Sequence, residues 1–361
     1  MITVTRTFMP SLEDYITHLQ RIWKSGQLTN NGELVIELAE KLEAFLGVRN
    51  LELVSNGTLA LQLAIKALDI RGEVITTPYS YVATATSIIW EGCDPVFVDI
   101  ENQSFCINAD LIEEAITEKT TAILATHVYG YPCDVEKIEA IARRNNLKVI
   151  YDAAHCFGVR FNGKSLAAYG DISTLSLHAT KVFHTAEGGG VVCRDNRIAE
   201  RISLLKKFGH VGEDQYLNIG INAKLSELHA AMGLCILPKI PEIIAHRRAC
   251  TERYDQLLDG LKLQRPAPVA ELEYNYAYYP VIFPSHESMM RVRAALMDNR
   301  IMPRRYFFPS LNRLPYLPAE RQTACPVSED IAGRVLSLPM SHALTETDIQ
   351  RISAIIRKEM P

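Results

Sequence analysis

One lysine in this sequence has the surroundings of a reactive amine. Lys181 has no Asp, Glu, Arg or other Lys within four positions on either side, and three glycines follow it at 188–190. A strand-like run, residues 171–177, leads into this stretch. A lysine that loses its proton can form a Schiff base with an aldehyde, and glycines let the backbone pass close to a ligand. An unreactive loop lysine is the alternative that the stretch alone leaves open.

A carboxylate stands at the end of the most strand-like run of the chain. Asp152 closes residues 147–152, which are rich in β-branched side chains. A carboxylate above an apolar sheet is costly unless a cation pairs with it. A protonated pyridine nitrogen is such a cation, and this pair sustains the electron-withdrawing ring of a pyridoxal cofactor. The alternative for Asp152 is an ordinary helix N-cap.

Residues 55–58, Ser-Asn-Gly-Thr, join a short strand to a helix. Gly57 lets the backbone approach a ligand, and the free N–H groups of a helix N-terminus suit a phosphate. A plain N-cap, in which Ser55 or Thr58 satisfies its own helix, is the alternative. The sequence has no Walker motif and no GxGxxG, which disfavours nucleoside triphosphates and dinucleotides. Further along, Tyr81 could stack on a flat heterocycle or could simply be a core aromatic.

Strands and helices alternate through the first half of the chain, and the strands are apolar on both faces. This pattern predicts an α/β fold with a mostly parallel sheet between helices. We expect a large domain over residues 1–238, with an N-terminal helical segment 1–32, and a smaller α+β domain over 239–361. The expected helices of the first half are 10–24, 33–45, 59–68, 81–90, 109–116 and 135–145, and the expected strands are 51–54, 73–76, 95–99, 121–127, 147–152, 171–177 and 189–193.

Bulk composition excludes several classes of protein. The chain has 361 residues, 22% of them charged, and a net charge of -4, which disfavours nucleic acid as a partner. We see no membrane-spanning run and no secretory signal, and the eight cysteines form no CxxC. His and Cys residues lack ligand spacing, so we expect no metal. These features favour a cytoplasmic protein with reduced thiols.

The order of these features resembles that of fold-type I pyridoxal-phosphate enzymes: a phosphate cradle, an aromatic residue, Asp152, and Lys181 29 positions later. Over nearly its whole length the chain resembles the DegT/DnrJ/EryC1/StrS family of sugar aminotransferases. The motifs that carry the resemblance are Leu28-Thr29-Asn30-Asn31-Gly32, Asp152-Ala153-Ala154-His155, Ser176-x-His178-x-x-Lys181, Glu187-Gly188-Gly189 and Gly220-Ile221-Asn222-Ala223-Lys224.

The resemblance implies a role for each matching residue. Lys181 would hold pyridoxal 5'-phosphate and move a proton to the sugar carbon, with pyridoxamine 5'-phosphate as the intermediate amine form. Asp152 would pair with the pyridinium nitrogen. The other residues implied to bind the cofactor are Gly57, Thr58 and Ser176 at the phosphate, Tyr81 on the ring, His155 at the ring's phenolic oxygen, and Asn222 at the phosphate of the neighbouring subunit of a homodimer.

The same resemblance implies a substrate side. Glu187 would line the sugar pocket, and Arg304, Arg305 and Tyr306 would help to enclose the nucleotide sugar, whose diphosphate suits arginine. A surface basic strand is the alternative for these arginines.

The reaction implied is transfer of an amino group from L-glutamate to a nucleotide-linked keto sugar. The first choice is C4 of dTDP-4-keto-6-deoxyglucose, for O-antigen or another surface polysaccharide. Amination at C3 is the nearest alternative. A sugar dehydratase of the same family carries His where this chain has Lys181, and a non-catalytic regulator would lack Lys181 or Asp152. An enzyme of fold type I that acts on free amino acids, with Arg304 or Arg305 on the α-carboxylate, is a further alternative.

Overall fold

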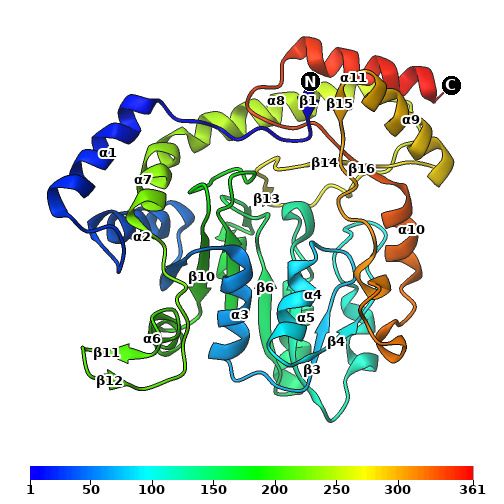
Figure 1. The fold of residues 1–361 in the computed structure, drawn as a ribbon. Coiled ribbons are helices and arrows are strands. Elements are labelled where there is room, and N and C mark those ends of the chain that lie inside the picture. The colour runs from blue at the N-terminus through cyan, green and yellow to red at the C-terminus, as the bar shows by residue number, and fades with distance from the viewer. Residues whose placement is uncertain (361) are drawn as a thin grey trace.

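A seven-stranded sheet forms the centre of the computed structural model, which describes residues 1–360 (Figure 1). The strand order is β2-β10-β9-β6-β5-β3-β4, and all strands run parallel except β10. The expected α/β fold with a mostly parallel sheet is confirmed. The strands are β2 (Leu51–Val54), β3 (Glu73–Thr76), β4 (Asp94–Phe97), β5 (Thr120–Thr126), β6 (Lys148–Asp152), β9 (Ile172–Ser176) and β10 (Gly189–Cys193).

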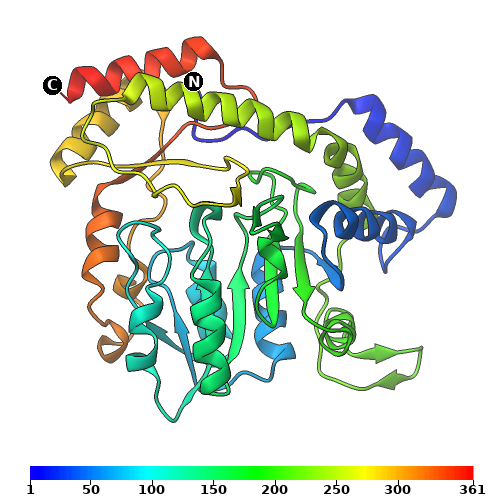
Figure 2. The same ribbon diagram turned by 180° about the vertical axis from the view of Figure 1, so that it is seen from behind.

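Helices cover both faces of this sheet, because successive strand residues point to opposite sides. Ile123 packs in one core cluster and Leu124 in another, and Val149 and Ile150 divide in the same way. One layer contains α3 (Gly57–Ala67), α4 (Ala83–Trp90) and α6 (Asn196–Leu205); the other contains α2 (Glu33–Leu46), α5 (Val135–Arg144) and α7 (Glu227–Ile236), and the two views show the layers in turn (Figures 1 and 2).

The C-terminal part lies across the carboxyl ends of the parallel strands (Figure 1). Its small sheet pairs β14 (Tyr279–Ile282) with β16 (Val335–Leu338), under the helices α8 (Ile240–Leu258), α9 (His286–Asp298) and α11 (Glu346–Glu359). The first strand, β1 (Ile2–Thr3), pairs with β15 (Ile301–Met302) of this part. The sequence analysis grouped residues 1–32 with the large domain, and this pairing joins residues 2–3 of that segment to the C-terminal part.

Helix limits follow local chemistry. Ser11 caps α1 (Leu12–Ser25) by accepting from the backbone N–H of Asp14, and Gly26 ends that helix with a φ of 68°. The N-cap of α2 is Gly32, which has no side chain to offer. The buried carboxylate of Glu227 takes over this role, because its oxygens accept from the N–H groups of Leu34 and Val35 at 2.8 and 3.0 Å.

The helical stretch Glu227–Leu258, which includes α7 and α8, is the one stretch within residues 1–360 that is long and apolar enough to cross a membrane by length and composition. Half of its apolar window is buried inside the protein. Its N-terminal half packs on α1 and α2 and its C-terminal half on α11. These contacts are those of a core helix, so the apolar composition is explained by packing.

Several elements differ from the sequence expectations. The helix expected over 109–116 is two 3-10 turns, Ala109–Leu111 and Glu113–Ala115, closed by i to i+3 hydrogen bonds. The helix expected from Tyr81 begins at Ala83. Elements that the sequence did not predict are α10 (Pro326–Arg334), the hairpin of β11 (His210–Val211) and β12 (Gln215–Tyr216), the small sheet of β7 (Arg160–Phe161), β8 (Lys164–Ser165) and β13 (Leu272–Glu273), and the 3-10 turns Val128–Gly130, Leu166–Ala168, Leu237–Lys239, Leu311–Arg313 and Ala319–Arg321.

Candidate active site

The predicted site residues gather at the carboxyl edge of the parallel strands. Asp152 is the last residue of β6, and Ser176 is the last residue of β9, two strands that pair directly. Gly57 opens α3 just beyond the end of β2. Ligands of open α/β sheets bind at this edge, since the loops that follow the strands converge there.

Lys181 lies in the loop between β9 and β10, and this loop is held at several points. The backbone N–H of Lys181 donates to the carbonyl of His178 at 2.9 Å. Two residues further on, Phe183 is fully buried and stacks on Phe157, with 4.4 Å between ring centroids. This anchor fixes the backbone beside the lysine, while the Lys181 side chain stays partly exposed towards the site.

Asp152 is 5% exposed and keeps both carboxylate oxygens hydrogen-bonded. The hydroxyl of Thr84 donates to Oδ2 at 2.7 Å, and the backbone N–H of Ala154 donates to Oδ1 at 3.1 Å. Burial raises the pKa of Asp152 above its ordinary value, although these two bonds and the charge of Lys181 oppose that rise. A positive partner at this carboxylate would therefore be strongly favoured.

The N-terminus of α3 forms the predicted phosphate cradle. Asn56 caps the helix by accepting from the N–H of Leu59 at 2.8 Å. Within residues 1–360 the N–H groups of Gly57 and Thr58 have no hydrogen-bond partner, so they are free to bind an anion. A Cβ at Gly57 would lie 3.1 Å from the Cβ of Ser176, which shows how closely the helix and the end of β9 approach. A hydroxyl and two free N–H groups thus meet at one point.

His155 lies in an aromatic cluster beside the lysine. Its ring stacks on Phe307 at 5.5 Å and 13°, and its Nδ1 accepts from the backbone N–H of Tyr129 at 3.1 Å. Burial lowers the pKa of His155 well below its ordinary value, so the imidazole is neutral at neutral pH. With Nδ1 as acceptor, the ring proton is assigned to Nε2.

These residues fit pyridoxal phosphate on three separate observations. The buried Asp152 has no cation within ion-pair distance in the described chain, as expected where a ring nitrogen completes the pair. The α3 cradle offers free donors to a phosphate. Lys181 approaches the same edge with an amine that no carboxylate holds within residues 1–360. The site can therefore hold the cofactor by its nitrogen, its phosphate and its aldehyde carbon.

Three of the four predicted substrate residues lie around a second hollow next to this site, and Glu187 does not line it. A pocket of ≈ 370 Å³ is lined by Tyr81, Arg304, Arg305 and Tyr306, as well as by Arg293, which the sequence analysis missed. Tyr81 is 59% exposed and precedes α4, so its ring is not a core aromatic. The side chain of Arg304 is exposed, and its backbone pairs with Ser337.

Arg305 has structural partners in this arrangement. Its Nη2 donates to the carbonyls of Ala332 and Gly333 at 3.1 and 3.3 Å, near the end of α10. The guanidinium also stacks on the ring of Phe308, 3.4 Å from the centroid. Arg304 and Arg293 have no such bonds within residues 1–360, and are the freer arginines of this pocket for an anion.

Two predicted residues stand at the border of the site. Glu187 is exposed, with one oxygen 3.6 Å from Nε2 of His178 in the same loop. Asn222 is exposed and accepts from Nζ of Lys224 at 2.7 Å. The segment that carries Asn222 runs beside the end of β2, where the N–H of Ser55 donates to the carbonyl of Ala223 at 2.9 Å.

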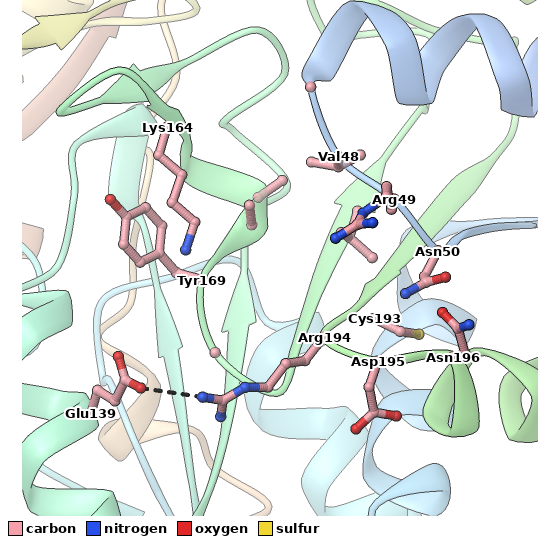
Figure 3. Close-up of a pocket in the computed structure, with 15 residues that line it drawn as sticks. Val48, Arg49, Asn50, Glu139, Lys164, Tyr169, Cys193, Arg194, Asp195 and Asn196 are labelled. Carbon is pink, nitrogen blue, oxygen red and sulfur yellow. Dashed lines mark hydrogen bonds and ion pairs between the residues drawn. The ribbon is translucent and has the colours of Figure 1, made fainter.

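A larger pocket, of ≈ 610 Å³, lies at the opposite end of the sheet (Figure 3). It is lined by Cys193, the last residue of β10, which pairs with the first residue of β9. Neither Lys181 nor Asp152 lines it. Its Arg194 is held by Glu139 and Asp171, each at 3.4 Å. The pocket is therefore separate from the candidate site.

The structure adds site residues that no sequence motif singled out. Thr84 lies inside α4, as the expected helix requires, and its hydroxyl also supports Asp152. Tyr278 lies outside the expected motifs, yet its hydroxyl is 3.3 Å from Nζ of Lys181. Residues 274, 276 and 279 are also tyrosines. A run of aromatic residues before a strand indicates core packing, so the sequence did not point to a polar role for the Tyr278 hydroxyl.

Comparison with known proteins decides the family. The model of the DegT/DnrJ/EryC1/StrS aminotransferase family matches residues 11–357. The chain belongs to this family. The aminotransferase is 42% identical to a dTDP-4-amino-4,6-dideoxy-D-glucose transaminase of Shigella dysenteriae, over 99% of this chain and 98% of that protein. It is 31% identical to a GDP-perosamine synthase of Escherichia coli O157:H7, over 95% and 94% of the two chains.

Solved structures with a similar fold also include a protein whose product is a TDP-sugar. The crystal structure of DesI in the presence of its TDP-sugar product matches with a TM-score of 0.93 and 31% identity, over 99% of this chain and 92% of that one. The expected family, fold class, enzyme class and cofactor are thereby confirmed: this protein is a pyridoxal-phosphate-dependent sugar aminotransferase.

Proposed function

We propose that this aminotransferase transfers the amino group of L-glutamate to C4 of dTDP-4-keto-6-deoxyglucose. Identity to the transaminases named for the 4-amino-4,6-dideoxy sugar is 42% and 40%. It exceeds the 31% to the GDP-perosamine synthase, which supports the choice of nucleotide, and the 30% to a UDP-N-acetyl-3-dehydro-alpha-D-glucosamine 3-aminotransferase, which supports the choice of carbon. The pocket beside Tyr81 supports it, because Arg304 and Arg293 offer cations where a sugar diphosphate would lie. Amination at C3 is the second candidate.

The residues of the site divide the chemistry among themselves. When bound, pyridoxal phosphate withdraws electrons from the carbon that gains or loses the amino group. Asp152 keeps the ring nitrogen protonated, and Thr84 keeps Asp152 in place. Lys181 holds the cofactor and then, as a free amine, moves the proton at the reacting carbon. The α3 N-terminus and Ser176 hold the phosphate end still.

The first experiment measures product formation from defined substrates. Purified enzyme is incubated with glutamate and with dTDP-4-keto-6-deoxyglucose, its 3-keto isomer, or GDP- and UDP-linked keto sugars, and products are identified by mass and NMR. We expect turnover of the dTDP-4-keto sugar to exceed that of the others by at least about tenfold. Preference for the 3-keto isomer or a different nucleotide would refute the proposed substrate.

Lys181 is tested by two variants. Lys181→Ala is expected to lower turnover by more than about 10³-fold, since both covalent attachment and proton transfer are lost. Lys181→Arg keeps the charge and is expected to be equally inactive, because a guanidinium stays protonated. Borohydride reduction followed by peptide mass analysis should find the cofactor on Lys181 in the wild type alone. Turnover by Lys181→Ala would remove Lys181 from the mechanism.

The remaining proposals concern the setting of the enzyme. We propose that it acts in the cytoplasm, as a homodimer, in the synthesis of O-antigen or another surface polysaccharide. Eight buried free cysteines support a reducing compartment. We also propose that the chain divides into two domains, residues 1–238 and 239–361. Strand β1 of the first domain pairs with β15 of the second.

A further inference from the structure

The amine of Lys181 has one hydrogen-bond partner among residues 1–360. Its Nζ lies 3.3 Å from Oη of Tyr278, which is 97 positions further along the chain. Tyr278 immediately precedes β14 of the C-terminal part. Its side chain therefore brings a hydroxyl from that part to the lysine at the carboxyl edge of the large sheet.

Aromatic neighbours hold the ring of Tyr278 in place. The ring packs edge-on against His155, with 4.9 Å between centroids, and edge-on against Tyr306 at 5.9 Å. Tyr129 packs on it at 5.6 Å and 54°. A ring with three aromatic neighbours cannot turn without disturbing them, so the position of its hydroxyl is defined before any ligand binds.

The backbone around Tyr278 is fixed as well. The side-chain amide of Asn275, which is 1% exposed, donates to the carbonyls of His155 and Phe157 at 2.9 and 3.0 Å. The buried Arg247 donates to the carbonyl of Ala277 at 3.1 Å, and burial lowers the pKa of Arg247 to about 10. These bonds join the segment to the loop after Asp152 on one side and to α8 on the other.

The chemistry of a tyrosine hydroxyl suits this position. A lysine that moves a proton alternates between an ammonium, which needs an acceptor, and a neutral amine, which can accept. A hydroxyl can accept from the first and donate to the second, whereas an ionised carboxylate such as Asp152 can only accept. The Nδ1 atom of the neutral His155 is already used by the N–H of Tyr129.

We propose that Tyr278 is a positioning residue, whose hydroxyl holds the amine of Lys181 in place in both protonation states. The proposal rests on the role of Lys181 proposed above. Tyr278 acts through the lysine and needs no contact with the reacting sugar. By this arrangement a residue of the C-terminal part sets the geometry of the proton-transferring group of the large sheet.

The test replaces the hydroxyl alone. Tyr278→Phe keeps the ring among its neighbours, and Tyr276→Phe is the matched control, because Tyr276 packs on Tyr274 at 5.0 Å and has no contact with Lys181. The first readout needs no catalysis: cofactor-free protein is treated with an amine-modifying reagent, and labelling of Lys181 is followed by mass spectrometry. We expect labelling about 3- to 10-fold faster in Tyr278→Phe, because the ammonium has lost its acceptor, and unchanged labelling in Tyr276→Phe.

The second readout is steady-state kinetics on the loaded enzyme. We expect kcat of Tyr278→Phe to fall about tenfold while KM for the sugar stays within about twofold. A merely structural role would instead lower the melting temperature and weaken cofactor binding together with KM. Wild-type labelling and wild-type kcat in Tyr278→Phe would overturn the proposal. Turnover by Lys181→Ala would overturn the role of Lys181 instead, so the two failures are distinguishable.

Discussion

The carboxylate of Asp152 is buried, and within residues 1–360 no side-chain cation pairs with it. Burial raises its pKa above the ordinary value of 3.8. In the cofactor-free protein the folded state thus keeps this proton to a higher pH than the unfolded chain does. The resulting contribution to stability is complete below pH 3.8 and is lost as the pH rises through the raised pKa. The ionised carboxylate that the cofactor needs therefore lowers the stability of the cofactor-free protein at neutral pH.

Asp152→Asn should separate the two effects. The amide cannot ionise, so the cofactor-free variant is expected to melt about 2–4 °C above the wild type at pH 8, and this difference should shrink as the pH falls towards 3.8. Turnover is expected to fall by about 10²-fold or more, because the ring nitrogen loses its counter-charge. Thermal melting of cofactor-free protein from about pH 4 to 8 measures the first effect.

The control for this prediction is Asp298→Asn, an exposed carboxylate in the last turn of α9. It should leave both melting and turnover unchanged. Equal melting of Asp152→Asn and the wild type at pH 8 would show that burial of Asp152 carries no such cost.

Elements bring the site together through close approaches that only glycine permits. A Cβ on Gly189, in β10, would lie 2.5 Å from the carbonyl carbon of Asn56 and 2.9 Å from the nitrogen of Gly57. The strand therefore presses directly on the start of α3. Gly189 therefore helps to shape the phosphate cradle as well as the loop that carries Lys181.

Gly189→Ala is expected to weaken cofactor binding by about 10- to 100-fold, because the added methyl group must push the α3 N-terminus away. Absorbance titration of cofactor-free protein measures the affinity. Gly333→Ala is the matched control, since nothing lies within 4 Å of its Cβ and it is within α10, where alanine is favourable. Unchanged affinity in Gly189→Ala would contradict the role given to this contact.

Sequence reasoning succeeded where the signal was local. The strand that ends in Asp152 and the loop that carries Lys181 were predicted from apolar runs and glycines, and both elements are present. It failed where packing between distant segments decides. The helical pattern of 109–116 gives only two 3-10 turns, Ala109–Leu111 and Glu113–Ala115. Tyr278 could not be selected, because its partner is 97 positions away.

At the scale of the whole molecule, a hairpin projects away from the body of the protein (Figure 1). The hairpin and its flanks expose apolar side chains, among them Tyr216 at 65%, Leu217 at 63% and Ile219 at 85%. Apolar groups on a projecting element are costly in water and favour burial against a partner. Asn222 follows directly, which supports the proposal that a second copy of this chain receives both the hairpin and the amide.

A complementation experiment tests the shared site. Lys181→Ala and Asn222→Ala are each expected to be impaired alone, and mixed subunits that exchange partners would contain one intact site. Activity should then return to about a quarter of the wild-type value, because half of the dimers are mixed and each has one intact site of two. Sedimentation should show a dimer. A monomer, or no recovery after verified subunit exchange, would contradict a site completed by the partner.

The pairing of β1 with β15 also has a consequence for biosynthesis. Ile2 leaves the ribosome long before its partner Ile301, which lies 299 positions further along the chain. Until then the backbone groups of β1 must remain with water or with a temporary partner. Since contacts between segments far apart in the sequence form slowly, we expect the C-terminal part to reach its final packing after the large sheet has folded. Strand β1, although synthesised long before β15, would therefore reach its final position late in folding.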